Sequence, residues 1–158
     1  MNRLSLKGLA LVEFAVLLPL LLVIIFGITE LGRALYQLNT LTKATDSGVR
    51  YLSRAWGALD GDCNPGPRWE QAQDATRALV VYGNPAGTGA PLLPGLSTGE
   101  ITIDVRGSAV PGSARAACVI TVSAATPFNA LSGEQIIPFT NIGPVTLRTS
   151  KEGRYLAR

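Results

Sequence analysis

The residues best suited to chemistry lie near the N-terminus, where one carboxylate interrupts a long apolar run. Residues 9–28 are almost all apolar, and Glu13 is the only charged side chain among them. A carboxylate inside a bilayer costs several kcal/mol near the centre and less toward the edge. Glu13 therefore either stays near the interface, reaching water or binding a proton, or it pairs with a cation.

A cut between Gly8 and Leu9 would supply that cation as a new α-amine, and Glu13 would become the fifth residue of the mature chain. One helix cannot easily fold its own end back onto Glu13, so we expect the amine of a neighbouring subunit to pair with it. In a low dielectric such a pair favours one axial stagger between subunits. Gly8 suits a protease cleft because it has no side chain. The positive charge of Lys7 keeps residues 1–8, the leader that such a cut would remove, on the cytoplasmic face.

No catalytic set or metal-binding set is found elsewhere. The chain has no His, no Cys pair at metal-ligand spacing, no nucleophile motif and no Gly-rich phosphate loop followed by Lys. Asp60 and Asp62 are not followed by the remaining ligands of a calcium loop. The basic residues are scattered at a net charge of +3, without a nucleic-acid-binding motif. The sequence predicts neither an enzyme, a cofactor, a metal site nor a nucleic-acid partner.

A single helix is expected to carry these N-terminal residues. The apolar run has about the 20 residues that a tilted membrane span requires, and no small-residue signal-peptidase site follows it. The helical pattern continues to about Ala55, with Gly57 closing it, which gives a length of about 70 Å. Pro19 is expected to kink the helix. Because Arg3 and Lys7 precede the span, the N-terminus should stay cytoplasmic and the remainder should be exported.

Beyond the span, a narrow seam at spacings of three and four marks one face of this helix. It comprises Leu31, Leu35, Leu38, Thr42, Thr45, Val49 and Leu52. The seam either packs on the chain's own domain or packs between molecules, and different stretches could do each.

The two cysteines, Cys63 and Cys118, fall in the part expected to be exported. That compartment permits a disulfide, which would stabilise the domain by roughly 4 kcal/mol in a chain-entropy treatment. The alternative is two small, buried, unpaired residues.

The remaining pattern predicts an α+β, pilin-like domain, with the long helix packed on a small antiparallel sheet of about three strands. A second helix is expected over residues 69–82, followed by a long Gly- and Pro-rich loop over 83–99. The strands are expected at 100–106, 117–125 and 145–150. Residues 127–131 and 136–139 are expected to cross the sheet and cap it.

Three stretches resemble the TadE-like family, minor pseudopilins of the tight-adherence (Flp-type IVb) pilus. They are residues 7–20 (KGLALVEFAVLLPL), residues 26–34 (FGITELGRA) and the helix from 39 to 54, with Gly-Val-Arg-Tyr at 48–51. The resemblance implies a prepilin peptidase that cuts after Gly8, with Glu13 and Phe14 as the recognition pair. Leu9 departs from the family, in which a polar residue is expected at that position.

The expected organisation is therefore a leader at 1–8, a transmembrane helix at 9–28, its extension at 29–56 and an exported domain at 57–158. The resemblance implies four partners: the prepilin peptidase, other pilins or pseudopilins, the pilus assembly platform and the lipid bilayer. It places the chain in a bacterial inner membrane, with one pass and a periplasmic C-terminal domain, or in a pilus. The alternative is an uncleaved inner-membrane assembly factor of the same or a related machine.

Overall fold

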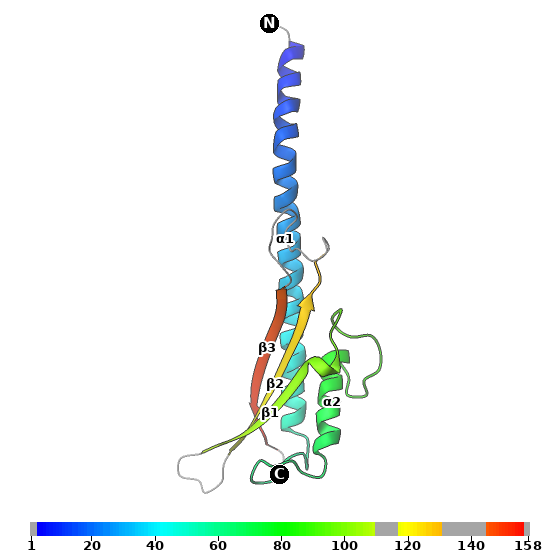
Figure 1. The fold of residues 1–158 in the computed structure, drawn as a ribbon, viewed down its shortest axis with the longest axis vertical. Coiled ribbons are helices and arrows are strands. Elements are labelled where there is room, and N and C mark those ends of the chain that lie inside the picture. Colours follow the sequence, from blue (N-terminus) through cyan, green and yellow to red (C-terminus); the bar gives the residue numbers. More distant parts are fainter. Residues whose placement is uncertain (1–2, 110–116, 131–144, 157–158) are drawn as a thin grey trace. The chain divides into compact units, whose positions relative to one another are not determined.

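The computed structural model describes residues 3–109, 117–130 and 145–156, with side chains from residue 8 onward (Figure 1). Two helices and three strands follow one another along this part of the chain. Its contacts divide it into two compact units, one formed by residues 1–35 and 129–145 and the other by residues 36–128 and 146–158. The α+β, pilin-like architecture expected from the sequence is confirmed.

The first helix, α1, spans Arg3–Ser53 and includes Pro19 without a break in the helical assignment. A kink at Pro19 stays a prediction. The helix was expected over about residues 9–55; it already begins at Arg3 and ends at Ser53, two residues before Ala55. After Ser53 the N–H of Ala55 bonds to a carbonyl only three residues back, which tightens the chain into a turn. Gly57, with φ +74°, lies beyond this turn instead of closing the helix.

The second helix, α2, spans Trp69–Tyr82, the bounds that the sequence predicted. Gly83 ends it in the left-handed region with φ +75°, and its N–H bonds to the Leu79 carbonyl. The loop expected over 83–99 is present, and its last residues enter a short 3-10 helix, Thr98–Glu100. Two buried side chains, Leu93 and Leu96, attach this loop to the core.

The sheet has three antiparallel strands in the order β1-β2-β3: β1 Ile101–Ser108, β2 Ala117–Phe128 and β3 Val145–Arg154. Each strand continues past its predicted end. In β2 the alternate residues from Cys118 to Phe128 are all buried, including Thr126. The capping segment expected at 127–131 therefore begins as the end of β2, and the segment at 136–139 lies outside the described residues.

The core of the second unit lies between the C-terminal part of α1, α2 and the sheet. Its fully buried side chains include Leu41 and Leu52 of α1, Val80 of α2, and Ile120 of β2. Gly48 permits the close approach, since a Cβ there would lie 2.6 Å from a methyl carbon of Val80. The C-terminal part of α1 is thus an integral part of the exported domain.

Candidate functional site

The N-terminal part of α1 carries a bare apolar surface. None of the residues from 8 to 29 is buried, and large side chains such as Leu11 and Val16 are about 70% exposed (70% and 72%). The helix Gly8–Ser53 is long and apolar enough to cross a membrane, by length and composition. An apolar surface of this extent requires lipid or partner helices to cover it. The bare helix and the disulfide described below indicate a membrane-anchored chain with an exported domain.

Gly8 lies within α1, so the Gly8–Leu9 peptide bond is helical and not part of an extended leader. A Cβ at Gly8 would meet nothing within 4 Å, and Leu9 is 67% exposed. A protease that binds an extended strand must therefore unwind the helix locally. Glycine makes this easier, because it is about 1 kcal/mol less favourable than alanine inside a helix.

Glu13 and Phe14 are both exposed, with Phe14 at 56%. Within the described residues, the Glu13 carboxylate has no hydrogen bond or ion pair. Because they are consecutive in a helix, the two side chains point about 100° apart around its axis. Leu9 lies one helical turn before Glu13 on the same side of α1, and no cation that pairs with Glu13 occurs among the described side chains.

Glu30 is the first buried residue of α1 among those whose side chains are described, from residue 8 onward, and was not singled out from the sequence. Its carboxylate pairs with Arg33 at 2.8 Å, and its side chain is only 4% exposed. Arg33 also donates a hydrogen bond of 3.4 Å to the carbonyl of Asn129, far along the chain. The acid–base spacing of three residues was a visible helical signal. The burial was not visible, because it depends on a segment distant in sequence.

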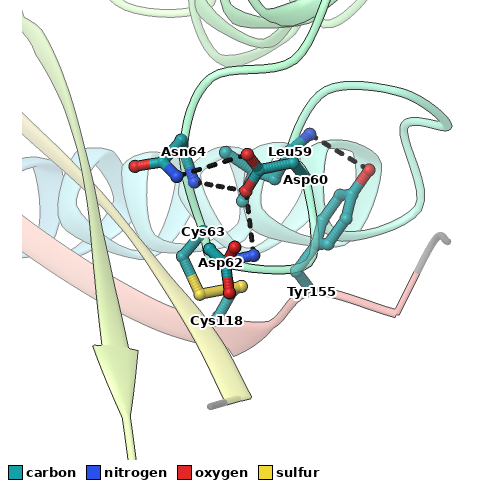
Figure 2. The surroundings of a disulfide bond; sticks show 7 residues. All are labelled: Leu59, Asp60, Asp62, Cys63, Asn64, Cys118 and Tyr155. Carbon is teal, nitrogen blue, oxygen red and sulfur yellow. Dashed lines mark hydrogen bonds between the residues drawn. A yellow bond between two sulfur atoms is a disulfide. The ribbon is translucent and has the colours of Figure 1, made fainter. Parts of the chain in front are cut away.

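The two cysteines are joined in a Cys63–Cys118 disulfide, with a Cα–Cα distance of 5.3 Å. Figure 2 shows the bond below a tight turn that is organised by the carboxylate of Asp60. Asp60 accepts hydrogen bonds from the Asn64 N–H at 2.8 Å and the Asp62 N–H at 2.9 Å. These donors, the Asn64 N–H above all, hold the pKa of Asp60 below its ordinary value of 3.8.

Tyr155 ties the end of the chain to the same region (Figure 2). Its hydroxyl donates to the Ala55 carbonyl at 2.7 Å and accepts from the Leu59 N–H at 3.3 Å. Its own N–H bonds to the Cys118 carbonyl at 2.8 Å. These contacts hold the C-terminal tail, the turn after α1 and the start of β2 together. No group of three potential metal ligands occurs among the described residues.

Comparison with known proteins identifies the N-terminal helix. Residues 8–50 match the model of the TadE family, described as TadE-like protein. No curated protein and no solved structure matches the chain. The match begins at the proposed cleavage residue and ends at Arg50, so it lies entirely within α1 and includes none of the sheet. The resemblance found in the sequence is confirmed over these residues: the N-terminal helix is similar to the TadE-like protein family.

Proposed function

We propose that this chain is a minor pseudopilin that takes part in assembling, priming or tipping a tight-adherence type IV pilus. One observation carries the proposal: the TadE-like match begins at Gly8, on a helix whose apolar surface is bare as far as Thr29. A single bare apolar helix joined to a disulfide-bonded domain suits a subunit that waits in the membrane and then packs among other helices. The family implies association with pilus machinery; the particular role is our proposal.

Maturation is the first step of the proposed function. Prepilin peptidase would unwind α1 around Gly8, hydrolyse the Gly8–Leu9 bond, and leave Leu9 with a free α-amine. The new amine is cationic at neutral pH. Glu13 and Phe14 lie within two turns of the cut on a fully exposed helix, so the peptidase can reach both of them.

Assembly is the second step, in which Glu13 sets the axial position. Its carboxylate lies on bare apolar helix, where burial without a partner is costly. The α-amine of an adjacent subunit removes that cost at only one axial displacement of the two helices. At any other displacement, both the amine and the carboxylate are left unpaired. The buried face of the C-terminal part of α1 meanwhile holds the domain to the helix, so the exported domain moves with it.

Intact mass tests the maturation step in membranes from cells with and without prepilin peptidase. We expect a chain beginning at Leu9 only when the peptidase is present. Gly8→Leu should leave full-length precursor, whereas Gly27→Leu should be cut normally. The two glycines form a matched pair, because both lie in α1 and a Cβ at either meets nothing within 4 Å. Full-length chain in both strains would refute processing.

Glu13→Val tests the assembly step. The variant should be cut but should fail to enter sheared pilus fractions or to crosslink to other pilins, and Glu13→Asp should retain part of this ability. Normal assembly of Glu13→Val would contradict the charge pair while leaving the processing step intact.

The second candidate is an uncleaved inner-membrane assembly factor. Two observations favour it: α1 is continuous from Arg3 through the Gly8–Leu9 bond, and Leu9 departs from the polar residue expected at that position. A full-length mass regardless of the peptidase, with crosslinks to the assembly platform, would support this candidate over the first.

A further inference from the structure

The C-terminal part of α1, within the second unit, has two different faces. One face is buried in the domain and comprises Leu41, Ala44, Thr45, Gly48, Val49 and Leu52. The other is exposed along its whole length. We call it the cationic face, and it comprises Tyr36, Asn39, Lys43, Ser47, Arg50, Tyr51 and Arg54. The seam noted in the sequence thus packs on the chain's own domain at Thr45, Val49 and Leu52, and the opposite side of the helix is left uncovered.

The charges on the cationic face are ordered. Lys43, Arg50 and Arg54 carry three positive charges, and Asp46 at the edge carries one negative charge. Asp46 pairs with Arg50 at 3.0 Å, yet the Arg50 side chain remains 73% exposed. Within the described residues, Lys43 and Arg54 form no ion pair. The face therefore presents a surplus of unneutralised guanidinium and ammonium groups.

Aromatic side chains and a hollow complete the surface. Tyr36 is 73% exposed and Tyr51 is 38% exposed. An open hollow of about 480 Å³ is lined by Arg50, Tyr51, Arg54 and Ala55. Tyrosine and arginine are the residues enriched where proteins bind one another, since both offer apolar area together with hydrogen-bond donors. The hollow has room for side chains of a partner, and Arg50 and Arg54 are among the residues that line it.

We propose that the cationic face docks an acidic helix of a different protein subunit, whose carboxylates follow the 4-3-4 spacing of Lys43, Ser47, Arg50 and Arg54. This inference deepens the proposed function, because it states the chemistry that a partner pilin or assembly protein would present. Two helices that pack side by side bring such rows together. The cation-bearing positions 43–54 span about 16 Å at 1.5 Å per residue, or three helical turns.

Charge selects this occupant over a second copy of the same face. Two cationic faces in contact would oppose like charges, which disfavours association by several kcal/mol at close range. A carboxylate row would instead meet Lys43, Arg50 and Arg54 and would form bidentate contacts with the two arginines.

The test uses the full-length, uncut chain in nanodiscs of zwitterionic lipid and a fluorescent 18-residue helical peptide with Glu at 4-3-4 spacing. The control peptide has the same composition, with its Glu residues distributed around the helix. By anisotropy, we expect the patterned peptide to bind at least about tenfold more tightly than the control peptide, and to weaken as NaCl is raised.

Charge-reversal variants locate the binding surface. Lys43→Glu with Arg54→Glu should weaken binding of the patterned peptide at least about tenfold. Arg148→Glu with Lys151→Glu on β3 makes the same change in net charge outside the cationic face and should alter binding less than about twofold. Equal losses in the two variants, or equal binding of the two peptides, would show attraction by net charge alone and overturn the proposal.

A lipid surface is the competing occupant. If the patterned peptide does not bind, and reversal at Lys43 and Arg54 instead abolishes co-flotation of the nanodisc-held full chain with phosphatidylglycerol vesicles relative to the β3 control, the face binds anionic lipid and the proposal is overturned. Because the binding assay uses uncut chain, a failure of the peptide to bind says nothing about whether the chain is cut after Gly8. The intact-mass experiment would still decide the proposed function.

Discussion

Removal of the Cys63–Cys118 disulfide tests both the energetics of the exported domain and its compartment. The bond joins residues 55 apart in sequence. Closure of such a loop removes conformational entropy from the unfolded chain, which corresponds to about 4 kcal/mol of stability at 25 °C. Domains of this size have a total stability of only about 5–15 kcal/mol. Cys63→Ser with Cys118→Ser should therefore leave a folded but weakly stable domain.

The assay is guanidinium unfolding of the full chain in detergent micelles, followed by the fluorescence of Trp56 and Trp69. A loss of about 4 kcal/mol should lower the unfolding midpoint by about 1 M, given the slopes usual for guanidinium. Wild-type chain kept reduced is the matched control and should unfold with the double variant. A loss below about 1 kcal/mol would refute the entropic reasoning.

The same cysteines report on export. In cells, trapping free thiols with a maleimide before lysis should leave Cys63 and Cys118 unlabelled. Retention of the chain in the cytoplasm, by deletion of residues 9–28, should make both thiols reactive. Reactive thiols in the membrane-inserted wild type would contradict an exported domain, since oxidising compartments are where such bonds persist.

Three further perturbations can be measured in the same unfolding assay or by NMR. Gly48→Ala should cost about 1–3 kcal/mol, because its Cβ would lie 2.6 Å from an α2 methyl carbon, whereas Gly27→Ala should not destabilise the chain; equal effects would contradict the close-packing argument. Glu30→Gln should cost about 1–3 kcal/mol by weakening a buried charged hydrogen bond, and Asp46→Asn, in an exposed pair, should cost less than about 1 kcal/mol. Carboxyl NMR should give Asp60 a pKa below 3.8. Because the pKa is lowered in the folded state, the ionised carboxylate contributes to stability above pH 3.8. That contribution is lost as pH falls through the folded pKa. A value at or above 3.8 would contradict the turn geometry.

Much of the fold was predictable because the patterns involved are local. The apolar run, the amphipathic period over 69–82 and the alternation in each strand depend on residues close in sequence, and all of these elements are present. Their ends were less predictable. β2 extends to Phe128, and its alternate residues stay buried up to that end, including the polar Thr126. The helix start at Arg3 was missed because residues 3–8 lack an apolar period.

The candidate site divides in the same way. Gly8 and Glu13 could be proposed from residue type and position along one helix, and Phe14 from the resemblance to the TadE-like family; all three stay predictions. The burial of Glu30 could not be predicted from the sequence, because it depends on the fold around the Glu30–Arg33 ion pair. Arg33 donates a hydrogen bond to the carbonyl of Asn129, which is distant along the chain. The pairing of Cys63 with Cys118 was open for the same reason: a sequence does not show whether two sulfur atoms meet.

The sequence by itself determined a long apolar helix with one carboxylate in its first 20 apolar positions, the lack of histidine, and the similarity of that helix to the TadE-like family. These properties follow from composition and from periodicities of a few residues. Only the tertiary structure decided which face of α1 is used by the domain and which remains free, as Val49 and Arg50 show by being buried and exposed, respectively. The physical reason is that burial is a property of pairs of surfaces, and the second surface here comes from α2 and the sheet, far along the chain.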